Sequence, residues 1–194
     1  MAITTEAIKE LRDATGVSVM QCKKALEEAG GDMQKAIVIL RKIAAAGAGK
    51  KSDRTLGAGI AASYTHAGGQ VVVAIILGCE TDFVARNPEF GKLAYDIAMH
   101  VAAMQPQFIT KEQVKDEDVK AAREVFEKEA ENVKEEMRAK VVEGKIDSYL
   151  KDKVLLEQPF VKNGEITIRQ LIDNGVQKFG EKIEVVRMER LAVK

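Results

Sequence analysis

The sequence predicts an α+β fold, in which a small helical head precedes a core made of a three-stranded antiparallel sheet packed with helices. Helical periodicity with cap residues fills the start of the chain, and an Ala/Gly/Lys-rich connector follows it. Two alternating apolar segments then flank a glycine turn, and a third closes the chain. We therefore divide the chain into a three-helix head (1–45), a linker (46–58) and a core (59–194).

Cap residues mark the helices of the head. Thr4 is placed as an N-cap, Ser18 opens a capping box with Gln21, and Asp32 precedes the third apolar face. Gly16 follows the first helical pattern, and a glycine pair follows the second, where helices commonly end. We expect three short helices around a modest core.

The linker and the hairpin come next. Glycines in the linker favour mobility at its ends, and its basic residues fit a solvated connector better than a nucleic-acid contact. Residues 60–64 alternate, residues 67–70 form a turn, and residues 71–77 are the most apolar run in the chain. Residues 71, 73, 75 and 77 would face one side of this strand, and Val72, Ala74 and Ile76 the other. Because both sets are apolar, we expect the strand to be covered on both faces.

A polar loop over residues 78–87 leads from this strand into a helix that opens at Asn87-Pro88. The loop carries Asp82 beside Phe83. Two interpretations remain open: Phe83 folds back into the core, as phenylalanines usually do, or the pair projects into a partner from a rigid strand–helix frame.

The remaining elements read as helices and one strand. The helix after Asn87 ends at Pro106. His100 lies one residue away from the apolar stripe of this helix, where a histidine is typically either on the surface or buried with its ring nitrogens hydrogen-bonded. Residues 111–153 are densely charged and predict one or two amphipathic helices, with Gly144 as a candidate interruption. A capping box at Thr167 starts the next helix, and residues 183–193 form the closing strand, with Val185 on its packed face.

Composition limits the class of protein. The 194 residues carry 30 basic and 30 acidic side chains, so the basic excess typical of nucleic-acid binding is missing. No apolar stretch approaches membrane-spanning length, and the first residues do not resemble a signal peptide. Cys22 and Cys79 match no metal spacing. We expect a cytoplasmic protein with reduced thiols, no cofactor or metal, and no nucleic-acid or membrane partner.

Two motifs, one in the helical head and one in the loop after the apolar run, resemble one family. Leu11-Arg12-Asp13-Ala14-Thr15-Gly16 and residues 22–32 resemble the ubiquitin-associated-type head of bacterial elongation factor Ts, and Thr81-Asp82-Phe83-Val84 is similar to that family's signature. The likeness extends over nearly the whole chain. It implies a guanine-nucleotide exchange factor for the translational GTPase elongation factor Tu, rather than an enzyme. Phosphate-loop, nucleophile-elbow and zinc-protease motifs are missing from the sequence, which fits that expectation.

The resemblance also implies contact residues. The loop of Thr81, Asp82, Phe83 and Val84 would enter beside the Mg²⁺ site of elongation factor Tu and disturb its phosphate loop, with Phe83 as the wedge. Contacts from the head are expected at Arg12, Val19, Met20 and Lys23. Weaker contacts from the core are expected at Val71, Val72 and His100. Met20 is either an apolar anchor or an idle exposed residue, and Val72 stands where relatives carry glycine. No catalytic residue is expected.

The chain resembles the short forms of the family, which have a single core half. The resemblance implies a homodimer, with the closing strand and Val185 as a pairing element, and a two-plus-two complex with elongation factor Tu. Two other classes remain open. One is a protein-binding module that uses the head without exchange activity, and the other is an RNA-associated structural protein, which the zero net charge disfavours.

Overall fold

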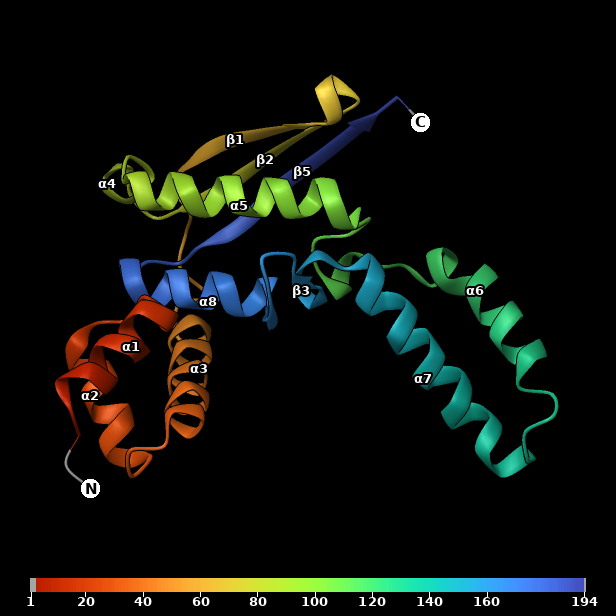
Figure 1. Ribbon diagram of the computed structural model, residues 1–194. Helices are drawn as coiled ribbons and strands as arrows, with labels where there is room; N and C mark the ends of the chain where they lie inside the picture. The colour runs from red at the N-terminus through yellow and green to blue at the C-terminus, as the bar shows by residue number, and fades with distance from the viewer. Residues whose placement is uncertain (1–2, 194) are drawn as a thin grey trace.

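The computed structural model describes residues 3–193 as a head, a core and a projecting helical arm (Figure 1). The three helices of the head are α1 (Thr5–Thr15), α2 (Val19–Glu28) and α3 (Met33–Gly49). Side-chain oxygens of Thr4, Ser18 and Asp32 each accept a backbone N–H of the first turn, as the sequence predicted. The helices close around their own apolar cluster, in which Leu11 and Leu26 are fully buried.

Helix α3 connects the head to the core and is longer than predicted. It continues to Gly49, so residues 46–49 of the predicted linker are helical. Its small residues allow close approach to helix α8 of the core, against which it packs; Ala44 is buried, and Ala48 lies against the main apolar core. Only residues 50–57 form an irregular connection.

The core is built on a three-stranded antiparallel sheet with the strand order β1–β2–β5. The strands are β1 (Ala58–His66), β2 (Val71–Cys79) and β5 (Glu184–Ala192). A short turn, η1 (Ala67–Gly69), joins β1 to β2, and its residues adopt the positive φ angles that glycine tolerates. The predicted α+β class, the hairpin and the closing strand are confirmed.

The sheet has one packed face and one open face. Val73, Ile75 and Leu77 of β2 belong to the main core, whereas Val72 and Ile76 are exposed. Figure 1 shows helices on one side of the sheet only. The prediction that β2 is covered on both faces is therefore wrong, because an antiparallel sheet can leave one side open even when its residues are apolar.

Helix α5 (Pro88–Met104) packs against the sheet, and α8 (Ile168–Phe179) lies on the other side of α5 (Figure 1). A short helix, α4 (Asp82–Ala85), precedes α5. Asn87 caps α5 and Thr167 caps α8, as predicted. Phe90 of α5 meets Phe179 of α8 edge-on, with ring centroids 5.7 Å apart. Helices α5 and α8 fix the position of the segment that follows β2.

The charged region forms an arm of two helices that extends away from the core, α6 (Asp116–Glu129) and α7 (Glu135–Lys153). Ala130, Val142 and Ile146 form a separate small core within the arm. Gly144 lies inside α7, so the predicted interruption there is wrong. A helical glycine costs only about 1 kcal/mol, and packing at the neighbouring Val142 and Ile146 offsets that cost.

Short elements connect the arm to α8. They are η2 (Lys111–Gln113), η3 (Leu155–Glu157), β3 (Pro159–Phe160) and β4 (Asn163–Thr167). The sequence pattern missed the β3–β4 pair, because such short strands show no periodicity. Within residues 3–193, no helix is long and apolar enough to cross a membrane.

Candidate functional site

One aromatic side chain projects from the segment after β2. The exposed fraction of Phe83 is 84%, whereas that of the adjacent Val84 is 4%. Val84 belongs to the main core and anchors α4, so its neighbour is turned towards solvent. The interpretation in which Phe83 folds into the core is therefore excluded. A large apolar ring exposed on a packed support is typical of a binding loop.

Asp82, on the same short helix, is also exposed. Its carboxylate pairs with the Arg86 guanidinium across one turn, with an N–O distance of 3.5 Å. Exposed pairs of this kind contribute roughly 0–1 kcal/mol. The carboxylate can therefore exchange this partner for another at little cost.

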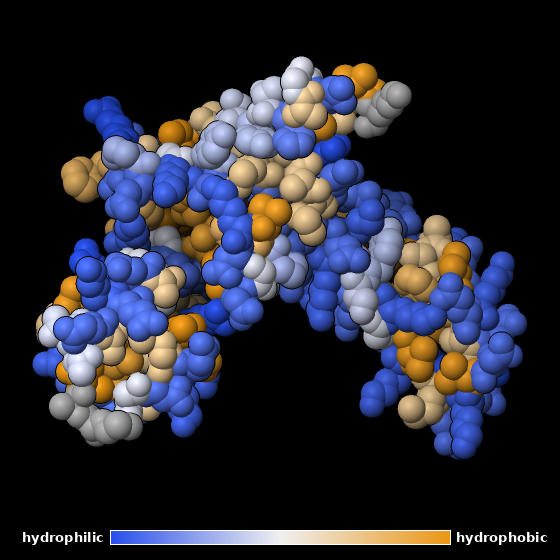
Figure 2. Space-filling view, viewed as in Figure 1, coloured by the Kyte–Doolittle hydropathy of each residue, from blue (hydrophilic) through white to orange (hydrophobic). Residues whose placement is uncertain are grey.

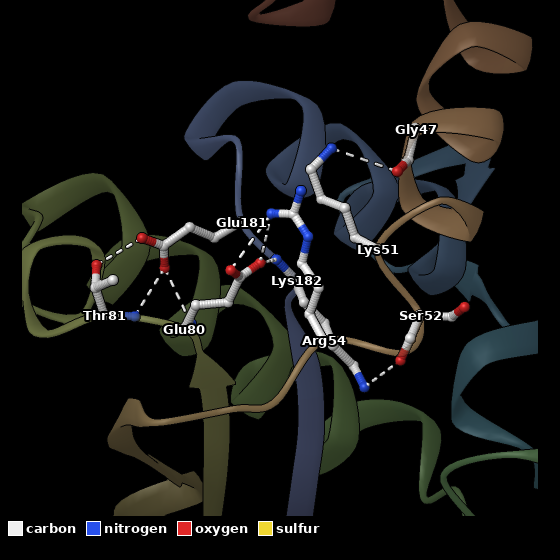
Figure 3. A network of polar contacts seen from close by, with 8 residues as sticks. All are labelled: Gly47, Lys51, Ser52, Arg54, Glu80, Thr81, Glu181 and Lys182. Atoms are coloured by element: carbon white, nitrogen blue, oxygen red, sulfur yellow. Dashed lines mark hydrogen bonds and ion pairs between the residues drawn. The ribbon is translucent and has the colours of Figure 1, made fainter.

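Two carboxylates hold the base of the loop (Figure 3). Glu181 accepts the backbone N–H groups of Glu80 and Thr81, both at 3.0 Å, and the Thr81 hydroxyl at 2.5 Å. Glu80 accepts the Lys182 N–H at 2.6 Å and the Arg54 guanidinium at 3.1 Å. The bond from the Lys182 N–H, followed by that from Arg54, holds the pKa of Glu80 below its usual value, against the opposing effect of burial.

The linker takes part in the same network. The Lys182 ammonium donates to the carbonyl of Ser52 at 2.6 Å, and the Lys51 ammonium donates to the carbonyl of Gly47 at 3.4 Å (Figure 3). With Arg54 bound to Glu80, two of the basic residues of the linker interact within this molecule. The linker is thereby tied to the base of the loop.

The head presents its four predicted contact residues to solvent. Arg12, Val19, Met20 and Lys23 are all exposed on α1 and α2. Of the two apolar residues, Met20 is the more exposed, with an exposed fraction of 65% against 49% for Val19. It lies in the first turn of α2, where Cys22 faces the core of the head and Met20 faces solvent, so its side chain is free to contact a partner. Figure 2 shows apolar residues on the surface of the head among hydrophilic ones.

The weaker candidates in the core divide into two groups. Val71 is half-buried and Val72 is exposed, both at the end of β2 next to the hairpin turn. His100 is fully buried: its Nε2 lies 2.9 Å from Oε1 of Gln158, and its Nδ1 accepts the Val161 N–H at 3.2 Å. The predicted partner contact at His100 is therefore corrected, because the ring has no exposed surface.

Metal-ligating side chains are scattered in the part of the chain that the structure describes. Between residues 3 and 193, no set of three or more His, Cys, Asp or Glu side chains is placed to hold a metal ion. Cys22 and Cys79 are free and buried, and burial raises the pKa of both thiols. The sequence analysis missed Glu181 and Lys182, which are about 100 residues from the loop they hold.

A projecting aromatic ring and exposed apolar residues on a helical head are typical of a protein that binds another protein. The sequence model of the family described as Elongation factor TS matches residues 5–194. The chain belongs to the elongation factor Ts family and is a translation elongation factor.

Individual relatives match over most of their length. The chain is 46% identical over 194 residues to elongation factor Ts of Thermodesulfovibrio yellowstonii, covering 100% of this chain and 97% of that one. It is 44% identical over 190 residues to elongation factor Ts of Desulforamulus reducens, covering 97% and 88%. It is 42% identical over 195 residues to elongation factor Ts of Pseudothermotoga lettingae, covering 100% and 98%.

Proposed function

We propose that this chain is a guanine-nucleotide exchange factor that promotes GDP release from elongation factor Tu in the cytoplasm. Family membership supports the role in translation. The observation that carries the exchange step is the exposed ring of Phe83, supported by a buried Val84 on the same short helix. The step needs a protein partner and requires neither nucleic acid nor a membrane.

The thermodynamics of exchange define what the factor must do. A translational GTPase holds GDP through Mg²⁺ and the amides and lysine of its phosphate loop. A factor that binds the nucleotide-free GTPase better than the loaded one weakens GDP binding, and GDP weakens factor binding by the same ratio. Phe83 is the wedge that displaces the Mg²⁺ ion and disturbs the phosphate loop, Asp82 orients the polar side of the contact, and Thr81 and Val84 fix the loop.

The magnitude of the effect calls for a second contact. Burying one phenylalanine contributes about 1.5–3 kcal/mol. Accelerating release by five decades needs about 7 kcal/mol, so the loop alone is insufficient. The exposed face of the head is the second anchor. Its contact residues are Arg12, Val19, Met20 and Lys23, which offer charge around an apolar centre.

The substitution Phe83→Ala tests the proposal. We expect it to slow the factor-stimulated release of a fluorescent GDP analogue at least tenfold, which corresponds to about 1.4 kcal/mol of lost stabilisation. Thermal unfolding should be unchanged, because the ring contributes little to the core.

The matched control is Met137→Ala, which removes another exposed apolar side chain on the arm. Release stimulated by Met137→Ala should equal that of the unchanged protein. Wild-type release rates for Phe83→Ala would contradict the proposal.

A second candidate function is passive protein binding through the head. The exposure of Val19 and Met20 on one helix favours it. The same release assay separates the two functions, because a passive binder associates with elongation factor Tu but leaves the rate of GDP release unchanged.

We further propose that the chain forms a homodimer and a two-plus-two complex with elongation factor Tu. Val185 is buried in the core of its own chain, so the pairing surface is the open face of the sheet instead. Val72 and Ile76 of β2 lie there, and Leu191 of β5 is paired with Val72. A second copy of the same apolar face is a self-complementary partner, as twofold dimers require.

A further inference from the structure

The helix that carries Phe83 lacks the cap its sequence offers. Thr81 occupies the N-cap position of α4, but its side chain makes no capping hydrogen bond. Thr4, Ser18 and Thr167 occupy the same position on α1, α2 and α8, and each accepts a backbone N–H of its own helix. The Thr81 hydroxyl donates to the carboxylate of Glu181, 100 residues further along the chain.

Glu181 is itself fixed by the core. It follows Gly180, whose left-handed conformation (φ of 76°) ends α8 and turns the chain towards β5. The last residue of α8, Phe179, packs against Phe90 of α5. The position of the carboxylate is therefore fixed relative to α5 and α8. Its three hydrogen bonds fix the positions of Glu80 and Thr81 in turn.

The need for such support follows from the size of α4. The helix has 4 residues, and a helix this short is unstable alone, because nucleation fixes several dihedral angles for few hydrogen bonds. Val84 anchors it from one side. The bonds to Glu181 fix the residues that lead into it, and so they set the direction in which Phe83 leaves the surface.

We propose that Glu181 is a positioning residue for nucleotide exchange, which holds Phe83 in its binding orientation before the partner arrives. The inference rests on the proposed function. A ring that is ordered in advance loses less conformational entropy on binding, so more of its contact energy is available to act on the nucleotide site. Without Glu181, the amides of Glu80 and Thr81 lose their acceptor, whereas Val84 and the Glu80–Arg54 pair remain.

The experiment compares three variants by GDP release from elongation factor Tu over a range of factor concentrations. Glu181→Ala should lower the maximal release rate about tenfold with little change in the half-saturating concentration, because the head still binds. Glu181→Gln should restore most of the rate, since its amide oxygen can accept both N–H groups and its NH₂ can donate to the Thr81 hydroxyl oxygen. Glu184→Ala removes the same charge nearby and should behave as the unchanged protein.

Amide hydrogen exchange in the free protein checks the geometry. Exchange at Glu80 and Thr81 should accelerate in Glu181→Ala and remain slow in Glu181→Gln. If Glu181→Ala does not fold, Thr81→Val removes the hydroxyl bond alone and should lower the maximal rate while leaving thermal unfolding unchanged.

The possible outcomes are distinct. A normal maximal rate for Glu181→Ala beside a slow Phe83→Ala would overturn the positioning role and leave the proposed function intact. An equal loss in Glu181→Ala and Glu181→Gln would overturn it as well, because the charge, and not the hydrogen-bond geometry, would then matter. A normal rate for Phe83→Ala would reject the proposed function itself.

Discussion

His100 shows how one buried polar residue joins distant parts of the core. Its ring connects α5 to Gln158 and to the backbone of Val161. The Gln158 amide in turn donates to the carbonyls of Met104 and Asp152, at the ends of α5 and α7. Because Nδ1 accepts a backbone N–H, the proton of the neutral ring lies on Nε2, and the Gln158 oxygen accepts it. The ring thus has a structural role.

This arrangement predicts a loss of stability at mildly acidic pH. Burial lowers the pKa of His100 in the folded state, although the bond to Gln158 acts in the opposite direction. The unfolded chain, with a histidine pKa of about 6.5, then binds more protons than the folded one below that pH. The contribution of His100 is therefore complete above the unfolded pKa and is lost as the pH falls through the folded one, by at most about 1.4 kcal/mol per pH unit.

Urea unfolding at pH 7.5 and pH 5.5 measures this loss. The variant His100→Asn should be less stable at both values but should lose less stability between them than the unchanged protein. His66 is exposed and present in both proteins, so it cancels in the comparison. Equal losses in the two proteins would refute the assignment.

At the scale of residues, the local sequence predicted the polar segment after the apolar strand but not how its ring would lie. The residues alone left two orientations of Phe83 open, and the structure selects the exposed one. The predicted loop over residues 78–87 is also shorter than expected, because Gly78 and Cys79 belong to β2 and Asp82–Ala85 form α4.

Prediction failed where the partner is distant. Nothing around Thr81 indicates that its hydroxyl donates to Glu181, and the spacing of His100 does not reveal that Val161 donates to its ring.

Among the elements, the α6–α7 arm is the most independent. Its small core of Ala130, Val142 and Ile146 is separate from the main core. Ion pairs between the helices, such as Arg123 with Glu143 and Lys145 with Glu129, are solvent-exposed and contribute little to the stability of the arm. The stability of the arm therefore depends on a few buried side chains.

We expect Ile146→Ala to unfold the arm locally while the rest of the core stays folded. Removing a buried isoleucine costs about 2–5 kcal/mol, a large share of what so small a cluster supplies. Amide hydrogen exchange should accelerate throughout α6 and α7 and stay slow in β2 and α5. Val125→Ala, an exposed position on α6, is the control and should leave exchange unchanged. Cooperative loss of protection in β2 would contradict the independence of the arm.

Element boundaries were predictable where caps mark them and uncertain elsewhere. Thr4, Ser18, Asp32 and Thr167 each begin a helix as the sequence indicated. The extension of α3 to Gly49 follows from its contact with α8, and that contact leaves no local signal. Tertiary packing of this kind commonly overrides the weak intrinsic preferences of glycine.

For the whole molecule, the open face of the sheet is an unpartnered apolar surface of the core. Sequence alternation predicted three strands but not which face of the sheet would remain uncovered. Val72, Ala74 and Ile76 are apolar, and so the sequence pattern predicted that they are buried. The exposed fraction of Ile76 is 41% in the single chain. Apolar residues in the middle of an open sheet face are typical of an interface.

We expect light scattering to give twice the mass of one chain, and Ile76→Lys to give the mass of one. The lysine would place a charge in the centre of the paired faces, whereas in a monomer it would lie in solvent and cost little. Val161→Lys, at an exposed apolar position away from the sheet, should remain dimeric. A monomeric mass for the unchanged protein would refute the pairing.

The packing of α3 against α8 has a consequence for affinity. Because one continuous helix belongs to the head and also rests on the core, Met20 and Phe83 are carried at a fixed separation rather than on a flexible tether. If both residues contact the partner as proposed, the second contact forms at a high effective concentration when the spacing fits, and does not form when it does not. We therefore expect avidity to make the protein selective for a partner whose two docking points match that spacing.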